Sequence, residues 1–369
     1  MNFRGRPPIR NRGTADNPAN RFAPIEYAVD GDFLDQSLVD PELSETVAPS
    51  PRTIFLRDTS RSLITYNNSP DLPFDASLNA YRGCEHGCIY CYARPTHEFL
   101  GFSSGLDFET RILVKENAPE LLRRELASSK WRPQLLAMSG VTDPYQPIEG
   151  RLQLTRRCLK ILAEFRNPVG IVTKNPLVRR DIDVLRELAR FDACTVNISI
   201  TTLRNDLHRV LEPRTPQPQR RLAAIEELAE AGIAVGVMVA PIIPGLTDHE
   251  LTDIVDAAAA AGARDAHYVV LRLPHAVHDL FVDWLEQHFP DRKDKVLNRI
   301  RDVRSGRLND TQFGRRMAGE GVFAEQIGRL FTLAVKKAGL EQFDAKLSTE
   351  HFRNPSGRQL TIFDEDAGS

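Results

Sequence analysis

The chain has 369 residues and a formal net charge of −2, so its overall charge gives no reason to expect a nucleic-acid partner. Apolar residues make up 41% and charged residues 27%, which is typical of a globular protein and excludes a disordered chain. Five cysteines, three of them clustered, argue against a disulfide scaffold. The polar, arginine-rich start and the lack of a long apolar run predict neither a signal peptide nor a membrane span. We therefore expect a cytoplasmic protein.

Residues 1–52 predict a flexible leader. Residues 1–21 contain five arginines and one acidic residue, whereas residues 22–45 contain seven acidic residues and neither lysine nor arginine. A stretch with prolines and few aromatic residues cannot bury a core of its own. We expect a solvated tail that is at most partly docked, rather than a specific nucleic-acid-binding arm.

Six short apolar segments that alternate with helical patterns predict a β/α repeat within residues 53–275. Several of them are nearly continuous in valine and isoleucine, as parallel strands covered on both faces must be. Gly232 and Gly262 follow two of the intervening helices, where a left-handed C-cap is expected. The repeat predicts an α/β fold, a partial (β/α)6 TIM-like barrel that is open on one side. The strand candidates are 77–80, 134–138, 170–173, 195–200, 234–239 and 267–271.

The chain after the repeat predicts a helical region over residues 276–346 and a polar tail over residues 347–369. Helical patterns cover 276–288, 293–303 and 322–338. Residues 292–316 contain nine basic and three acidic residues, a local net charge of +6. This basic segment is the best phosphate-binding candidate in the chain. A solvated basic face that is balanced by acidic residues elsewhere is the alternative interpretation.

Three of the five cysteines lie in one short loop. Cys84, Cys88 and Cys91 have the spacing Cys-x3-Cys-x2-Cys, and Tyr90 precedes the last of them. Such a loop can wrap three thiolates around one cuboidal 4Fe-4S cluster, one ligand fewer than the usual four. One iron is then open, and it can bind and reduce a cofactor.

Two other interpretations of this loop exist. A zinc site would use the same cysteines with His86 or His97 as the fourth ligand, but neither histidine gives the paired spacing usual in structural zinc sites. Incidental core cysteines are not expected between glycines and charged residues, where these three lie. Cys158 and Cys194, by contrast, lie in apolar surroundings and are predicted to be buried and inert.

The loop and its aromatic residue resemble the signature of the radical S-adenosylmethionine (radical SAM) enzymes. The resemblance implies one 4Fe-4S cluster on Cys84, Cys88 and Cys91, with SAM bound at the open iron. It also implies that an electron from an external donor cleaves SAM reductively, and that the resulting 5′-deoxyadenosyl radical takes hydrogen from a substrate. The cofactors carry this chemistry, while the protein holds them and excludes water.

Polar residues at successive predicted strand ends extend the resemblance. Taken alone, a strand-end serine or aspartate is more often a helix N-cap, so their value lies in their order after the cysteine loop. The segment 139–143 stands where these enzymes often carry Gly-Gly-Glu, and the sequence departs from that triplet. The implied SAM contacts are Ser139 and Asp143 for the methionyl amine, Lys174 for its carboxylate, Ser199 and Thr201 for the ribose, and Tyr90, Ile243 and Gly245 for the adenine.

The segments 79–84 and 91–97, with Leu-Glu-Pro-Arg at 211–214, resemble the spore photoproduct lyase-like branch of this family. The true lyase carries a hydrogen-donating cysteine near the position of Met138, and no cysteine replaces it here. Reversal of a thymine dimer is therefore not carried over to this chain. The catalytic candidates, chosen because they are expected near the barrel mouth, are Tyr92, His97 and Tyr145.

Three hypotheses about function follow. The first is a radical SAM enzyme that acts on a nucleic-acid base in a DNA-repair-like reaction. The second keeps the radical chemistry but gives it a peptide or a small metabolite as substrate. The third is a zinc-stabilised nucleic-acid-binding module without catalysis. Salt-sensitive binding of DNA or RNA distinguishes the first from the second, and several irons per chain exclude the third.

A short motif near the end of the chain points to a protein partner. The segment Gln359–Phe363, Gln-Leu-Thr-Ile-Phe, resembles the Gln-Leu-x-Leu-Phe peptide by which bacterial DNA-handling proteins dock on the replication sliding clamp. Such a peptide buries leucine and phenylalanine anchors in a groove. Matches of five residues also arise by chance, and the alternative is that these residues fold back on the barrel.

Overall fold

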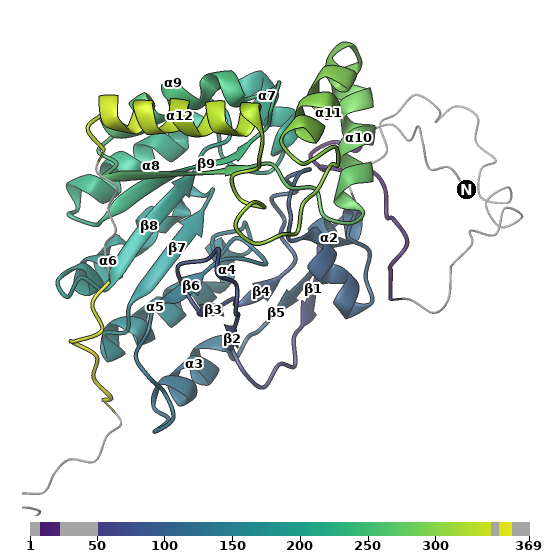
Figure 1. The fold of residues 1–369 in the computed structure, drawn as a ribbon. Helices are drawn as coiled ribbons and strands as arrows, with labels where there is room; N and C mark the ends of the chain where they lie inside the picture. The colour runs from purple at the N-terminus through teal and green to yellow at the C-terminus, as the bar shows by residue number, and fades with distance from the viewer. Residues whose placement is uncertain (1–7, 23–50, 341–346, 356–369) are drawn as a thin grey trace, which may run out of the picture.

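The computed structural model describes residues 8–22, 51–340 and 347–355. Its centre is a seven-stranded sheet in which six neighbouring strands run parallel and one edge strand is antiparallel (Figure 1). The six parallel strands are those that the sequence predicts, and they form the expected partial barrel. In spatial order the strands are β10 (Asp265–Val270), β9 (Val235–Ile242), β8 (Cys194–Ser199), β7 (Val169–Thr173), β6 (Leu136–Met138), β3 (Ala76–Leu78) and β2 (Ile64–Tyr66).

Helices cover the outer face of this sheet (Figure 1). Strand side chains such as Val196 and Ile198 are fully buried beneath them, because parallel strands of this kind lose contact with water on the helix side. Gly232 and Gly262 follow two of the helices with φ of +77° and +92°, as the sequence predicts. No described helix is both long and apolar enough to cross a lipid bilayer. The covering helices are α3 (Ala118–Leu126), α5 (Leu154–Phe165), α6 (Ile182–Ala189), α8 (Pro218–Glu230) and α9 (Leu251–Ala260).

Three further helices follow the barrel, and each coincides with a predicted one. Helices α10 (Val277–His288) and α11 (Lys293–Asp302) pack in an apolar cluster with Ile89 of the cysteine loop. Helix α12 (Val322–Lys337) lies against α9 and β10, where the rings of Phe331 and Tyr268 are 4.6 Å apart. The helical region therefore extends the wall of the barrel on one side and covers the cysteine loop on the other.

A small second sheet and several short helices leave no recognisable pattern in the sequence. The sheet has the order β1 (Ile54–Arg57), β5 (Arg111–Val114) and β4 (Tyr81–Arg82). Strands of two to four residues are too short to show a period of two. The short helices are η2 (Arg94–Leu100), α2 (Leu106–Thr110), α4 (Glu149–Leu152), η3 (Pro176–Asp181), α7 (Asn205–Leu211), η4 (Asp248–Glu250) and η5 (Pro290–Arg292).

Residues 8–22, which we call the N-terminal strap, are docked on the loop region around the cysteines. The Asn20 side chain donates hydrogen bonds to the carbonyl oxygens of Glu98 and Phe102, at 2.8 and 2.9 Å. The backbone N–H of Gly13 donates to Glu109 Oε2 at 3.0 Å. This part of the leader is irregular, as predicted, but it is held in place, so a flexible leader does not describe residues 8–22.

Residues 347–355 also depart from the expectation of a loose tail. The backbone N–H of Arg353 donates to the carbonyl of Phe165 at 2.9 Å, and that of Ser348 donates to Asp192. Phe352 packs against Phe165 with 6.1 Å between ring centroids. One apolar side chain and a few backbone hydrogen bonds therefore dock this stretch on the outside of the barrel. The segment Gln359–Phe363 lies outside the described residues, so docking on a sliding clamp stays a prediction.

The strap gives a testable prediction. A Cβ atom at Gly13 would lie 1.9 Å from the carbonyl oxygen of Gly87, so Gly13→Ala must move the strap away from the cysteine loop. We expect the substitution to destabilise the protein by roughly 1–3 kcal/mol. Thermal unfolding of Gly13→Ala measures this, with Gly150→Ala as the control, since a Cβ at Gly150 meets no atom within 4 Å. Equal melting temperatures of the two variants would contradict the tight packing of the strap.

Candidate active site

The cysteine loop follows β4 and has no regular secondary structure. Its thiols form no disulfide; Cys84 and Cys88 are 6% and 7% exposed, and Cys91 is half-buried. Gly83 and Gly87 have φ of +79° and +66°, which favours glycine at both positions. A Cβ at Gly87 would lie 2.6 Å from a carboxylate oxygen of Glu109. The glycines that flank the cysteines therefore allow the loop to curl and to pack tightly.

A buried ion pair fixes the shape of this loop. Arg94 is fully buried, and its guanidinium donates to the carbonyl oxygens of Cys88 at 2.9 Å and Gly105 at 3.0 Å. The same guanidinium forms an ion pair with Glu109 at 2.6 Å. Removal of one member of such a pair leaves an uncompensated buried charge, which costs about 3–5 kcal/mol. The sequence gives no signal for this pairing, because Glu109 lies on α2, outside the motif.

The donor set fits an iron–sulfur cluster better than a zinc ion. A cuboidal cluster binds each thiolate through a different iron, so the three thiols need not converge on one point. Among the described residues, no three His, Cys, Asp or Glu side chains are placed to hold a single metal ion. His97 is fully buried, and its Nε2 lies 2.9 Å from the carbonyl oxygen of Arg111, while His86 Nδ1 lies 3.4 Å from Asp143. Neither histidine therefore completes the zinc site that the sequence left open.

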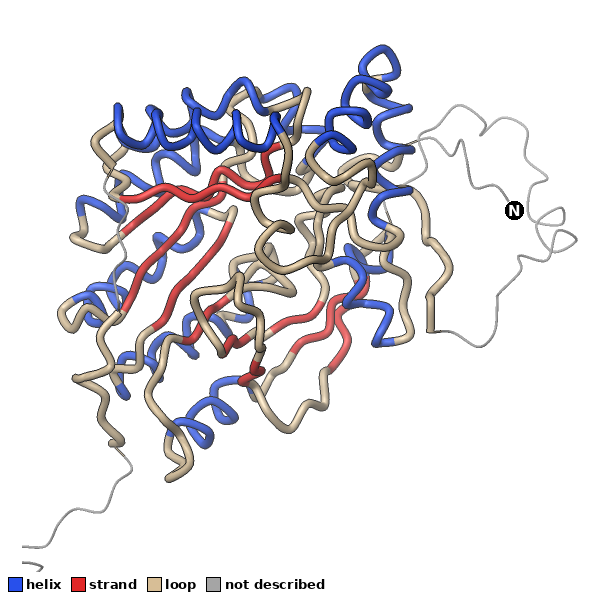
Figure 2. The backbone as a smooth tube through the Cα atoms, in the orientation of Figure 1, coloured by secondary structure: helices blue, strands red, loops and turns tan. Residues whose placement is uncertain are grey.

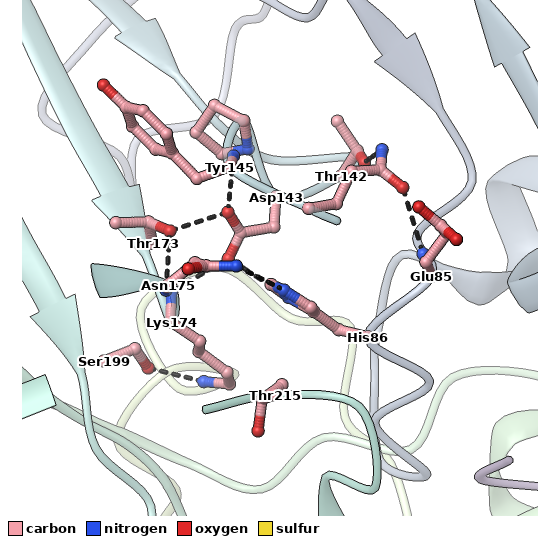
Figure 3. A network of polar contacts seen from close by, with 12 residues as sticks. Glu85, His86, Thr142, Asp143, Tyr145, Thr173, Lys174, Asn175, Ser199 and Thr215 are labelled. Atoms are coloured by element: carbon pink, nitrogen blue, oxygen red, sulfur yellow. Dashed lines mark hydrogen bonds and ion pairs between the residues drawn. The ribbon is translucent and has the colours of Figure 1, made fainter. Parts of the chain in front are cut away.

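The ends of β6 and β7 are joined by Asp143 (Figure 3). Its Oδ1 accepts hydrogen bonds from Thr173 Oγ1 at 2.7 Å and from the backbone N–H of Tyr145 at 2.8 Å. Its Oδ2 accepts from the backbone N–H of Lys174 at 2.8 Å and faces His86. The carboxylate predicted to meet the methionyl amine is thus fully engaged in connecting two strand ends with the cysteine loop.

Four of the predicted SAM contacts come together beside this junction. Lys174 Nζ donates to Ser199 Oγ at 2.6 Å, and lies 5.8 Å from the centre of the Tyr90 ring. The Tyr90 hydroxyl lies 3.1 Å from Thr201 Oγ1. Figure 3 shows Lys174 reaching from the end of β7 towards Ser199 on β8. The carboxyl ends of the parallel strands therefore bring together residues that are far apart in the sequence.

A buried carboxylate at the centre of this group has no role in the sequence-based prediction. Glu212 belongs to the Leu-Glu-Pro-Arg segment and is fully buried. It accepts a short hydrogen bond from the Tyr90 hydroxyl and forms an ion pair with Arg221. Burial alone would raise the pKa of Glu212, but the cations around it, Arg221 first, hold that pKa well below its usual range. The one signal available was a charged residue directly after the buried Leu211, which is a weak signal.

The other three predicted contacts also lie at strand ends. Ser139 is half-buried and makes no side-chain hydrogen bond within the described chain. Ile243 is fully buried, and its backbone N–H donates to Thr247 Oγ1 at 2.9 Å. Gly245 has φ of +79°, and a Cβ there would lie 3.5 Å from the Arg299 side chain, so it packs against α11. Their part in binding adenine or the methionyl group remains a prediction.

Two of the three catalytic candidates are not at the barrel mouth. Tyr145 is fully buried, and its hydroxyl donates to Asp181 at 3.1 Å, because the η3 segment captures the ring on the helix side of the sheet. His97 is fully buried between the rings of Phe102 and Phe108. Both expectations are corrected: these side chains support the structure and face no opening.

Tyr92, the third candidate, does border an opening. The side chain is 50% exposed and lines a cavity of about 310 Å³ beside the cysteine loop. The guanidinium of Arg272, which follows β10, lies 4.8 Å from the centre of the Tyr92 ring. Three arginines and two aromatic rings contribute to the lining, in which apolar surface predominates. The lining residues that matter here are Arg21, Tyr92, Phe99, Arg272, His275 and Arg316.

The basic segment 292–316 offers fewer free charges than its sequence suggests. Arg304 is buried beneath the end of β10, where it donates to the carbonyl oxygens of Val270 and Leu271, and burial lowers its pKa to about 10. Four more basic residues have internal partners, and only Arg316 of the segment reaches the cavity. These pairs are Lys293 with Glu286, Arg299 with the Phe323 ring, Arg315 with Glu320, and Arg316 with Asp71.

A three-cysteine loop at the carboxyl ends of a partial parallel barrel defines a class of iron–sulfur enzymes. The radical SAM superfamily model matches residues 78–258. An uncharacterized protein of Mycobacterium tuberculosis is 41% identical over 238 residues, which cover 64% of this chain and 69% of that protein. The chain belongs to the radical SAM superfamily, and it is an enzyme of that superfamily whose reaction is unassigned. Membership implies a 4Fe-4S cluster and SAM.

Solved structures and a phage protein add to this comparison. A variant of spore photoproduct lyase has a TM-score of 0.56 at 17% identity, covering 79% of this chain and 85% of that chain. A second, titled as a complex with dinucleoside spore photoproduct, has a TM-score of 0.54 at 17% identity, covering 77% and 79%. At this identity the likeness shows the fold alone. The "Radical SAM Nalpha-GlyT isomerase" of Pseudomonas phage M6 is 28% identical over 216 residues, 58% of this chain and 42% of that protein.

The buried His97 gives a prediction about pH. Burial lowers the pKa of His97 to about 4 from its usual 6.5. Between these values the unfolded chain binds a proton that the folded chain does not, so stability falls as the pH falls through this window. At pH 5.5 we expect a loss of about 1 kcal/mol, and no such loss in His97→Gln, whose amide can still donate to Arg111. Urea unfolding of both proteins at pH 7.5 and 5.5 measures the difference; an equal pH dependence would contradict the assignment.

Proposed function

We propose that this enzyme cleaves SAM reductively and acts on a base of a nucleic acid. The observation that carries the proposal is the cavity beside Cys91, in which the half-buried Arg272 lies over Tyr92. An aromatic ring next to arginine is the combination on which nucleic-acid-binding proteins stack bases and hold phosphates. A peptide or small metabolite would not require this combination.

The charges around the cavity also favour an anionic ligand. Arg21 is paired with Glu98, and Arg316 with Asp71. Within the described part of the chain, Arg272 makes no ion pair, although burial and the nearby Arg316 lower its pKa. A half-buried cation without a carboxylate partner is costly in an apolar setting, so an incoming phosphate would stabilise it.

The names of two similar proteins agree with this substrate class. The phage relative is named for an Nalpha-GlyT isomerase activity, and a structural neighbour for its complex with a dinucleoside. The first shares sequence with this chain and the second shares its fold. Both support a base or nucleotide as the substrate here, and neither identifies which one.

The chain's own residues have distinct tasks in this proposal. Cys84, Cys88 and Cys91 would bind the cluster, and Lys174 and Tyr90 would hold SAM beside it. When bound, the cluster and SAM supply a 5′-deoxyadenosyl radical that abstracts hydrogen, with an external electron donor as the source of the electron. Helices α10 and α11, packed on the cysteine loop, exclude water from that side.

The proposal is tested first by quantifying 5′-deoxyadenosine under anaerobic, reducing conditions. We expect the cluster-loaded protein to form it, and expect single-stranded oligonucleotides to stimulate its formation more than peptides do. The variant with Cys84, Cys88 and Cys91 changed to alanine should bind no cluster and form none. The control changes Cys158 and Cys194 to alanine, since both are buried away from the loop. Stimulation by peptides alone would instead favour the second hypothesis.

Arg272 allows a sharper test of the substrate class. We expect Arg272→Met to weaken oligonucleotide binding about tenfold and to reduce the slope of log K against log salt by about 1, since one phosphate contact is lost. Fluorescence anisotropy at several salt concentrations measures both. Arg190→Met, at an exposed arginine after α6, is the control and should leave the affinity unchanged. An unchanged salt slope in Arg272→Met would argue against phosphate binding at the cavity.

A further inference from the structure

Glu212 is the point at which four separate segments meet. Its carboxylate accepts from the Tyr90 hydroxyl of the cysteine loop and from Arg221 of α8, both through short hydrogen bonds. Lys174 Nζ, after β7, lies 3.9 Å away, and Thr215 Oγ1 lies 3.2 Å away. Because Glu212 is fully buried, these contacts are not exchanged for water.

Arg221 holds Glu212 in place from behind. It is 1% exposed and also donates to the carbonyl oxygens of Ser199 and Pro216, both at 3.0 Å. The Glu212–Arg221 pair is therefore tied to the end of β8 by backbone contacts. A carboxylate fixed in this way cannot follow a moving partner, so it sets the position of whatever side chain binds it.

Two such side chains lie on the cofactor side of the pair. The Tyr90 ring is fixed at its hydroxyl by Glu212 and Thr201. Lys174 is held between Glu212, Ser199 Oγ and the carbonyl oxygen of Ala240, the last at 3.3 Å. One buried carboxylate therefore stands beside two permanent cations, and since Arg221 is bonded directly to it, Lys174 keeps positive charge to offer to an anionic group.

We propose that Glu212 is a positioning residue for SAM: it holds the Tyr90 ring and the Lys174 ammonium in the arrangement that receives the cofactor, and it joins the cysteine loop to the ends of β7 and β8. The inference rests on the proposed function, because it takes these side chains to face SAM. It predicts that the Tyr90 hydroxyl, which contacts no cofactor atom in this arrangement, contributes to SAM affinity and not to cluster binding.

The test removes the Tyr90 hydroxyl and leaves the ring. Tyr90→Phe and the wild type are loaded with cluster, and iron content, melting temperature and SAM affinity are measured, the last by equilibrium dialysis on oxidised protein that cannot turn over. We expect unchanged iron content and a SAM dissociation constant about tenfold higher, the usual effect of one lost hydrogen bond to a charged group. Glu212→Gln should shift the affinity in the same direction, and if it does not fold, Tyr90→Phe decides.

Tyr81→Phe is the matched control. Tyr81 and Glu149 are both fully buried, and the Tyr81 hydroxyl donates to the Glu149 carboxylate, so this variant loses the same kind of hydrogen bond outside the cofactor site. It should bind SAM as the wild type does, whatever its melting temperature. Wild-type affinity in Tyr90→Phe, or an equal loss in Tyr81→Phe, would overturn the inference. A wild type that binds cluster but no SAM would overturn the proposed function as well, so the two failures are distinguishable.

Discussion

The buried ion pair between Arg94 and Glu109 is the interaction on which the site depends. Arg94 binds the carbonyl oxygen of Cys88 from one side, while Glu109 receives the strap through the backbone N–H of Gly13 on the other. The cysteine loop has no secondary structure of its own, so its shape comes from these contacts and from its two left-handed glycines. One pair thereby fixes the loop and docks the N-terminal strap, two features that look unrelated in the sequence.

A second constraint is the parallel sheet, whose strands all end at the same edge. Asp143, Lys174 and Ser199 follow three different strands, and each is hydrogen-bonded to the next strand's end. The loops that Figure 2 shows beyond the strand ends converge on the same region. Because the strand ends share their hydrogen bonds, the polar groups form one connected network and not a set of separate contacts. Such a network orients side chains before any ligand arrives, which lowers the cost of ordering them on binding.

Charge is distributed differently from what composition suggests. The segment 292–316 has a local net charge of +6, yet most of its cations serve internal contacts, with Arg304 beneath β10 as the clearest case. The charge that faces the cavity comes instead from Arg272, together with Arg21 of the strap. A run of basic residues shows how much charge a segment carries, whereas its partners decide how much of that charge is free to bind a ligand.

The sequence by itself determined the six parallel strands, the helices after them and the three-cysteine loop, because each leaves a local signal: a run of branched apolar residues, a helical period or a fixed spacing. It also placed Tyr90, Lys174, Ser199 and Thr201 together, since strand order alone brings strand ends to one edge. Only the tertiary structure decided the pairs that join distant segments, Arg94 with Glu109 and Glu212 with Arg221, and the burial of His97 and Tyr145. Such pairs depend on the direction in which each side chain leaves its backbone, and residue types and spacing do not encode that direction.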